Sequence, residues 1–349
     1  MGSNLSQSSE NNSFTSDDLK ISKTSSDEFG ILLIAHGSSL PYAEETFKEI
    51  ANKYIAKTGH NTEVGYMKVA EPSISEAINI LTSRNSAIKK IIAMPVFLAP
   101  GIHTNIDIPI ILGLNPKETD PRCPDGNYPD DHYLNQTNPI SFTGEIDLIE
   151  CIGPDSIIID IINKRVKEVL IESEKDIDPE KTAVLLVSHG SRLNYNREFI
   201  NNIYKQYKNQ TNFHVGQGFM ELCEPTISQG IDNIAKETDF DRLIVVPVFL
   251  APGVHTNRDI PSILGILERD EKDETSETGE TDKTDDSHSH DHSTHSHHHH
   301  DHSHSHDHDH SHGHGDDVDF DGEILYTEPL GADDLIIDII KERVESKID

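Results

Sequence analysis

The sequence predicts an α/β protein of two similar domains, each a parallel sheet flanked by helices. Short apolar runs rich in branched residues alternate with amphipathic segments of helical periodicity, which is typical of right-handed βαβ units. In addition, the segment PVFLAPGIHTNIDIP at 95–109 returns as PVFLAPGVHTNRDIP at 247–261, with thirteen of fifteen positions identical. A repeat of this kind indicates two copies of one domain within the 349 residues.

In the first copy, each apolar run predicts a strand and each amphipathic segment a helix. The expected strands are 30–35, 63–69, 91–98 and 145–151, and the expected helices are 41–58, 74–81 and 154–169. Asp107, just before Ile108 and Pro109, is expected to cap a helix. A polar insertion at 115–143 is expected to form an exposed loop.

The second copy repeats this plan, with an acidic, histidine-rich insertion at the same place, 267–321. The expected strands are 183–187, 215–220, 243–250 and 323–326, and the expected helices are 196–207 and 332–344. The chain is therefore expected to consist of a disordered polar tail at 1–28, a first repeat at 29–175 and a second repeat at 182–346.

The composition argues against several classes of protein. A formal net charge of −33 disfavours a nucleic-acid partner, because phosphate binding needs a basic surface. No apolar run reaches the roughly 20 residues of a membrane helix, and the first residues lack the apolar core of a signal peptide. Three cysteines without a CxxC pair predict neither a disulfide framework nor a thiolate zinc site. We expect a cytoplasmic protein without a membrane partner.

Four histidines follow the ends of predicted strands. His36 and His103 lie 67 residues apart in the first copy, and His189 and His255 lie 66 apart in the second. The loops at the carboxyl ends of parallel strands form the ligand crevice, so each pair is expected to converge on one rim. A lone histidine in such a loop more often sets a turn, but matched spacing in two copies favours function. Each pair is expected to bind a divalent metal, to act as a base, or to do both.

Glycines accompany these histidines in both copies. They predict either backbone with positive φ or close approach of backbone to a ligand, with free amides offered to an anion. The four positions are Gly37, Gly101, Gly190 and Gly253. A phosphohistidine phosphatase would need an arginine directly before His-Gly. Ala35 and Ser188 stand there, which argues against that activity.

Three segments together resemble the class II tetrapyrrole chelatases that act on sirohydrochlorin, the CbiX/CfbA family. They are the His-Gly-Ser after the first strand, the Phe-Met-Glu-Leu-Cys-Glu-Pro at 219–225, and the repeated Pro-Val-Phe-Leu-Ala-Pro-Gly-x-His-Thr-Asn-x-Asp-Ile-Pro segment. The resemblance covers nearly all of 29–167 and 182–346. Because short members of this family are homodimers, it implies two fused chelatase-like domains, a pseudo-dimer within a monomer, with the active cleft between them.

The resemblance also implies roles for individual residues. It makes His36, His103, His189 and His255 metal ligands, with His36 and His189 also accepting protons. It makes Glu221 the catalytic acidic residue of the second copy, where the first copy has Lys68. Because the substrate carries carboxylates, Lys68, Arg192 and Arg258 are candidate cations that would bind them. It places two loops against the macrocycle, formed by Leu98, Ala99, Pro100, Gly101 and Ile102 and by Leu250, Ala251, Pro252, Gly253 and Val254.

The sequence thus predicts a chelatase that inserts Co(II) or Ni(II) into sirohydrochlorin, with release of two protons, for cobalamin or for the nickel tetrapyrrole of methanogenesis. The metal is a substrate, and no tightly bound cofactor is expected. Histidine suits this chemistry because it is both a metal ligand and a base of moderate pKa. The alternative is a non-catalytic nickel- or cobalt-binding protein or metallochaperone on the same scaffold.

The histidine-rich insertion is expected to bind metal loosely and to deliver or store it. Its densest part contains His288, His290, His292, His297, His298, His299 and His300.

Overall fold

The computed structural model describes residues 28–38, 41–173, 175–191, 193–267 and 318–348. The tail expected at 1–28, apart from its last residue, lies outside these ranges, as do the histidine-rich insertion between 268 and 317 and Arg192. Among the described helices, none combines the length and the apolar character needed to cross a membrane.

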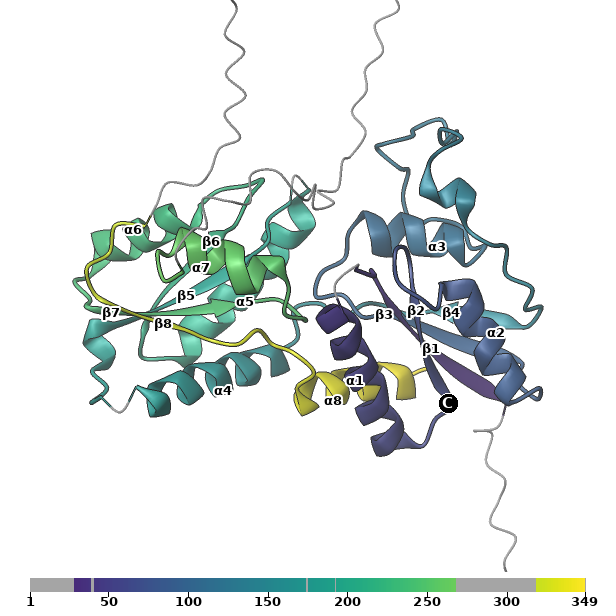
Figure 1. Cartoon of the computed structure of the whole chain (residues 1–349), viewed down its shortest axis with the longest axis horizontal. Helices are drawn as coiled ribbons and strands as arrows, with labels where there is room; N and C mark the ends of the chain where they lie inside the picture. Colours follow the sequence, from purple (N-terminus) through teal and green to yellow (C-terminus); the bar gives the residue numbers. More distant parts are fainter. Residues whose placement is uncertain (1–27, 39–40, 174, 192, 268–317, 349) are drawn as a thin grey trace, which may run out of the picture.

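The first half forms a four-stranded parallel sheet in the order β2-β1-β3-β4 (Figure 1). Its strands are β1 (Phe29–Ala35), β2 (Thr62–Tyr66), β3 (Lys90–Pro95) and β4 (Glu145–Leu148). The strands expected at 63–69 and 91–98 end earlier, at Tyr66 and Pro95. Beyond Tyr66 the N–H of Met67 still donates to Ala35 of β1 at 3.0 Å, but the extended backbone ends by Val69, which has a positive φ of 67°.

The second half repeats this sheet in the order β6-β5-β7-β8. Its strands are β5 (Thr182–Ser188), β6 (His214–Phe219), β7 (Arg242–Pro247) and β8 (Glu323–Tyr326). The strand expected at 243–250 also stops early, at Pro247. Both sheets are wholly parallel, with the first strand of each half between its second and third. The predicted α/β fold of two similar domains is confirmed.

Helices cover both faces of each sheet (Figure 1). The first half contributes α1 (Pro41–Thr58), α2 (Ile74–Arg84), α3 (Ile108–Ile111) and α4 (Ile157–Glu172), and the second contributes α5 (Asn194–Gln210), α6 (Ile227–Glu237), α7 (Ile260–Ile263) and α8 (Asp334–Glu345). Two five-residue π-helices, η2 (His103–Asp107) and η5 (His255–Asp259), lead directly into α3 and α7. Two 3-10 turns, η3 (Tyr133–Gln136) and η4 (Pro179–Lys181), complete the described elements.

The last helix of each half packs against the other half. Helix α4 contacts α5, β7 and β8, whereas α8 contacts α1 and β3 (Figure 1). Hydrogen bonds hold each of these helices on the other half. Arg165 on α4 donates to the carbonyl of Leu330 at 2.8 Å, and Arg343 on α8 donates to the carbonyl of Ile152 at 2.6 Å. Each half therefore depends on a helix supplied by the other.

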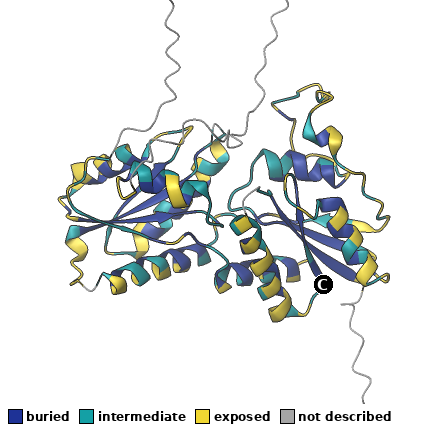
Figure 2. Ribbon diagram, viewed as in Figure 1, coloured by how far each residue is buried: buried dark blue, intermediate teal, exposed yellow. Residues whose placement is uncertain are grey.

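Alternation along the strands divides the apolar core into three parts. Ile31 and Leu33 belong to a large cluster that also contains Val184 and Leu186 of the second half. Leu32 and Ile34 point to a separate cluster confined to the first half, and the second half has its own counterpart. The central strands β1, β3, β5 and β7 are largely buried and the edge strands β4 and β8 only half-buried, while the outer surfaces of the helices are exposed (Figure 2). Because α4 and α8 are exchanged, the core on one face of the two sheets is continuous.

The insertion at 115–143 is not simply an exposed loop, contrary to the expectation. Leu134 and Asp120 are buried, and Tyr128 and Tyr133 pack against the cluster confined to the first half. The aromatic and aliphatic residues within this polar segment explain the difference, because each removes apolar surface from water when it packs on the domain. The insertion thereby reaches the histidine pair of the first half.

Candidate functional site

The structure brings each predicted histidine pair together. His36 directly follows β1 and His103 begins η2 after the neighbouring strand β3, so both lie at the carboxyl edge of the first sheet. Their ring centroids are 4.9 Å apart in an edge-to-face arrangement. His189 and His255 repeat this arrangement in the second half, with centroids 4.8 Å apart.

The first histidine of each pair is oriented by the backbone that follows it. The Nδ1 atom of His36 lies 2.9 Å from the carbonyl oxygen of Gly37, and that of His189 lies 3.1 Å from the carbonyl oxygen of Gly190. A carbonyl oxygen only accepts, so Nδ1 is the donor in both rings. The Nε2 atom is then the nitrogen of each ring that can take up a metal ion or a proton.

The second histidine of each pair is oriented by a carboxylate four residues later. The Nδ1 atom of His103 lies 2.5 Å from Asp107 Oδ2, and that of His255 lies 2.8 Å from Asp259 Oδ2. Burial opposes ionisation of both carboxyls, but hydrogen bonds from the imidazole and from an arginine hold the pKa of each below its ordinary value. The ionised carboxylate fixes the donor at Nδ1, so Nε2 is again the nitrogen that can take up a metal ion or a proton.

The expectation that Asp107 caps a helix was wrong, because its side chain makes no capping hydrogen bond. The π-helix places Asp107 beside His103 instead. The signal in the sequence is the HTNxD motif, whose four-residue spacing brings a histidine and an aspartate together on one helical face. The two aspartates are functional candidates that the sequence reasoning missed.

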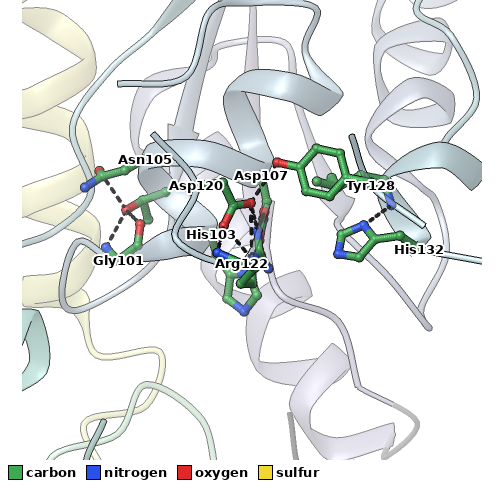
Figure 3. A network of polar contacts seen from close by, with 10 residues as sticks. Gly101, His103, Asn105, Asp107, Asp120, Arg122, Tyr128 and His132 are labelled. Carbon is green, nitrogen blue, oxygen red and sulfur yellow. Dashed lines mark hydrogen bonds and ion pairs between the residues drawn. The ribbon is translucent and has the colours of Figure 1, made fainter. Parts of the chain in front are cut away.

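An arginine from the insertion at 115–143 binds the carboxylate that orients His103. Arg122 makes ion pairs with Asp107 and with Asp120, the latter at 2.8 Å (Figure 3). Tyr128 donates to Asp120 at 2.7 Å, so the insertion holds the arginine in place. Burial would lower the pKa of Arg122, but Asp120 and Asp107 raise it above its ordinary value. No repeated motif marked this residue in the sequence.

The second pair is more open than the first. The side chain of His255 is 43% exposed against 20% for His103, and Asp259 is 29% exposed where Asp107 is completely buried. The arginine on Asp259 is its own neighbour Arg258, which donates at 3.1 Å from a largely exposed position. The two halves thus use different arginines on their matching carboxylates.

Lys68 and Glu221 stand at matching positions beside the first histidine of each pair. Their backbone N–H groups donate to the carbonyls of His36, at 3.2 Å, and of His189, at 3.0 Å. The carboxylate of Glu221 approaches His189, with 3.2 Å between Oε1 and Nε2. The ammonium of Lys68 lies 5.2 Å from the centre of the Tyr133 ring, which belongs to the insertion.

Two of the predicted glycines are required by close packing. Gly37 and Gly190 have φ values of 91° and 97°, and an added Cβ would lie 1.9 Å from the carbonyl oxygen of Lys68 or 1.8 Å from that of Glu221. Any side chain there would displace the loop that carries Lys68 or Glu221. The absence of a side chain at these glycines therefore lets the loop after β1 pack against the loop that carries Lys68, and the loop after β5 against the loop that carries Glu221.

The other two glycines do not offer free amides. The N–H groups of Gly101 and Gly253 each donate to the hydroxyl of a threonine, Thr104 or Thr256, at 2.8 Å. The idea that these amides bind an anion was therefore wrong. A Cβ at either glycine would meet nothing within 4 Å, so the backbone there has space beside it.

The two loops expected to meet the macrocycle lie directly before the π-helices. Leu98 and Ala99 pack on the shared core, and Leu250 forms part of it. The remaining loop residues are half-buried: Pro100, Gly101, Ile102, Ala251, Pro252, Gly253 and Val254. Each loop therefore combines an anchored start with a partly exposed end beside a histidine.

A polar bridge joins the halves near these loops. Asn105 on η2 donates to Glu118 at 3.0 Å, and Tyr195 near the start of α5 donates to the same carboxylate at 2.7 Å. The hydrogen bond to Glu118, followed by burial, raises the pKa of Tyr195 above its ordinary value. The site-bearing segments of the two halves thus meet through Glu118.

The four histidines nevertheless form two pairs rather than one cluster. Among the described residues, no three or more His, Cys, Asp or Glu side chains gather in a way that could hold a metal ion. A hollow of about 310 Å³ where α1, α4 and α8 meet is lined by charged residues such as Lys53, Lys164 and Asp333 and contains none of the candidate site residues. Arg192 and the histidine-rich insertion lie outside the described residues.

Comparison with known proteins gives matches to both halves. The family model described as CbiX matches residues 30–169 and again residues 183–347. The sirohydrochlorin cobaltochelatase of Methanocaldococcus jannaschii is 47% identical over 162 residues, which cover 46% of this chain and 96% of the relative. That of Methanopyrus kandleri is 41% identical over 167 residues, 48% of this chain and 96% of the relative. Such relatives have the length of one half.

Solved structures with the same two-domain fold match nearly the whole chain. SirB from Bacillus subtilis with Fe³⁺ has a TM-score of 0.57 at 14% identity and covers 92% of this chain and 96% of its own. CbiX described as the terminal enzyme for biosynthesis of siroheme in denitrifying bacteria has a TM-score of 0.50 at 14% identity, covering 91% and 98%. At these identities the similarity concerns the fold.

Proposed function

This chain belongs to the CbiX family, and from that premise we propose that it inserts Co(II) into sirohydrochlorin with release of two protons. The observation that carries the proposal is the pairing of two imidazoles in each half, with both Nδ1 atoms engaged as donors. The relatives named sirohydrochlorin cobaltochelatase support the same substrate and metal.

The reaction exchanges ligands on the metal. The cation leaves water and protein ligands for the four nitrogens of the macrocycle, while two pyrrole N–H groups lose their protons. An imidazole with Nδ1 held by a carbonyl or carboxylate presents Nε2 first to the metal and then, once the metal has moved, to a proton. The carboxylate of Glu221, 3.2 Å from His189 Nε2, stabilises either cation at that atom.

The substrate is proposed to bind along the two loops that precede the π-helices. These are Leu98–Ala99–Pro100–Gly101–Ile102 and Leu250–Ala251–Pro252–Gly253–Val254, whose later residues are half-exposed. Lys68 and Arg192 are candidate partners for the carboxylates of the macrocycle. The chain is proposed to work as a monomer, with its two halves in the places of the two subunits of a short relative.

The choice of metal rests on the relatives, whose names favour cobalt. Nickel, for the tetrapyrrole of methanogenesis, is tested in the same assay. The histidine-rich insertion is proposed to collect the scarce metal, because its imidazoles and carboxylates suit loose multidentate binding. No observation on the described residues favours a non-catalytic metal carrier, and the relatives named sirohydrochlorin cobaltochelatase support the enzyme.

The product of the reaction tests this proposal. After anaerobic incubation of the protein with sirohydrochlorin and Co(II), mass spectrometry is expected to find a macrocycle that has gained one cobalt and lost two hydrogens. A pH-sensitive dye should report two protons released per cobalt inserted. A macrocycle converted no faster than in buffer, with either cobalt or nickel, would contradict the proposal.

A further inference from the structure

We propose that metal insertion takes place at the His189–His255 pair and that the His36–His103 pair has lost the ability to hold the divalent cation. The residues that decide this are Glu221 and Lys68. The inference rests on the proposed function and deepens it, because it assigns the reaction to one of two centres that look alike in sequence. Three observations on the described residues support it.

The first observation is a reversal of charge at one structural position. The backbone N–H groups of Lys68 and Glu221 donate to the carbonyls of His36 and His189, and the carbonyls of Lys68 and Glu221 themselves lie against Gly37 and Gly190, whose φ values are positive. The backbone is therefore the same, and only the side chain differs. The carboxylate of Glu221, 3.2 Å from His189 Nε2, attracts a divalent cation, whereas the first half has a positive charge on the matching residue, Lys68, which disfavours one.

The second observation concerns the carboxylate behind the other histidine. Asp107 is completely buried and shared between His103 and Arg122, so its negative charge is largely neutralised within the protein. Arg122 is itself held by Asp120. Asp259 carries the arginine Arg258 in an exposed position, where solvent weakens the ion pair. The negative charge of Asp259 is therefore less compensated than that of Asp107, and it stabilises a cation bound to His255 more strongly.

The third observation is access. His255 is 43% exposed and His189 38%, whereas His103 is 20% exposed. The insertion contributes to this difference, since it brings Arg122 onto Asp107 and the Tyr133 ring within 5.2 Å of the Lys68 ammonium. A hydrated cation and a large macrocycle both reach the second pair more easily. All three differences favour binding of the divalent cation at the His189–His255 pair.

The test compares matched substitutions in the two halves of the full-length chain. Initial rates of cobalt insertion are measured against the concentration of free Co(II), so that kcat and KM for the metal are separated. We expect His189→Ala to lower kcat/KM by about 100-fold and His36→Ala to lower it by less than about fivefold. Glu221→Lys is expected to raise KM for Co(II) by at least about tenfold. All variants keep the histidine-rich insertion, so its metal binding is common to them.

Exchanging the charges of Lys68 and Glu221 tests whether these two residues decide which histidine pair is active. In the double variant Lys68→Glu with Glu221→Lys, insertion should depend on His36 rather than on His189. Circular dichroism and the unfolding midpoint of each variant show that a lost rate is not lost folding.

Equal losses for His36→Ala and His189→Ala in the natural background, or a larger loss for His36→Ala, would overturn the assignment. An exchanged chain that still depends on His189, or that no longer inserts cobalt, would contradict the role of the two charges. A natural chain that fails to accelerate insertion of any metal is a different result, because it refutes the proposed function itself.

Discussion

The carboxylates that orient His103 and His255 have the same role but different surroundings. Asp107 is completely buried and paired with Arg122, while Asp259 is 29% exposed and paired with an arginine that solvent reaches. Removing one member of a buried ion pair leaves the other member charged and poorly solvated, which costs far more than losing an exposed pair. Substitutions of Asp107 and Asp259 therefore form a matched comparison of a buried and an exposed ion pair.

We expect Asp107→Asn to lower the free energy of unfolding by about 3 kcal/mol. The same change at Asp259 should lower it by less than about 1 kcal/mol. Urea denaturation of the two variants at neutral pH measures both values. Because the pKa of Asp107 is lowered in the folded protein, its contribution is present above the carboxyl pKa of the unfolded chain, about 3.9, and is lost as the pH falls through the folded value. Equal destabilisation by the two changes would show that burial of Asp107 is energetically unimportant.

Gly190 provides a second residue-scale prediction. Gly190→Ala introduces a Cβ 1.8 Å from the carbonyl of Glu221 at a φ of 97°, so the loop that holds Glu221 beside His189 must move. We expect a loss of about 1–3 kcal/mol in stability together with a large loss of chelation. Gly253→Ala is the control for stability, since its Cβ meets nothing within 4 Å. Thermal unfolding that does not separate the two variants would contradict this explanation.

Much of the site at this scale was predictable, because the repeat marks the two histidine pairs and the neighbouring strands bring each pair together. The roles of Asp107 and Asp259 were present in the HTNxD spacing but were mistaken for a helix cap. Arg122 was not predictable, since it belongs to an insertion whose sequence is not repeated in the second copy and reaches Asp107 only through the tertiary fold.

At the scale of elements, the exchange of α4 and α8 is the main departure from two self-contained repeats. Strand positions followed from apolar runs and helix positions from amphipathic periodicity, with errors mainly at the strand ends. Periodicity identifies the face of a helix that is buried but not the surface that covers it. The partner of each closing helix therefore could not be predicted from the local sequence.

The exchange predicts where a core substitution acts. Ile340 on α8 and Ile162 on α4 are both completely buried and occupy matching positions in the two halves. Ile340→Ala should lower hydrogen-exchange protection in α1 and β3 of the first half, and Ile162→Ala in α5 and β7 of the second, each by about 2–4 kcal/mol of opening free energy. Loss of protection confined to the half that contains the substitution would contradict the exchange.

The histidine-rich insertion gives a further prediction. Deletion of residues 268–317 should leave the rate of cobalt insertion intact when Co(II) is abundant and should lower it when Co(II) is buffered at scarce levels. The reason is that loosely held metal near the enzyme matters only when supply limits the reaction. Replacing the histidines of this segment by serine at constant length serves as the control for length. An equal loss of rate at every metal concentration would contradict a role in metal supply.

At the scale of the whole molecule, the fusion of two halves allows them to differ. Relatives such as the cobaltochelatase of Methanopyrus kandleri have the length of one half. In this chain each half carries its own residue at each position, so the first half can have Lys68 where the second has Glu221. The shared core, the exchanged helices and the bridge through Glu118 keep the two halves together while their centres diverge.

The rate of cobalt insertion tests the central claim most directly. The natural chain and the double variant His36→Ala with His189→Ala are compared anaerobically with sirohydrochlorin and Co(II), following the absorbance change of the macrocycle. The predicted result is a rate that rises in proportion to the concentration of the natural protein and falls to the spontaneous rate in the double variant. A natural chain that is indistinguishable from the double variant, or from buffer, would contradict the claim that this protein is a chelatase.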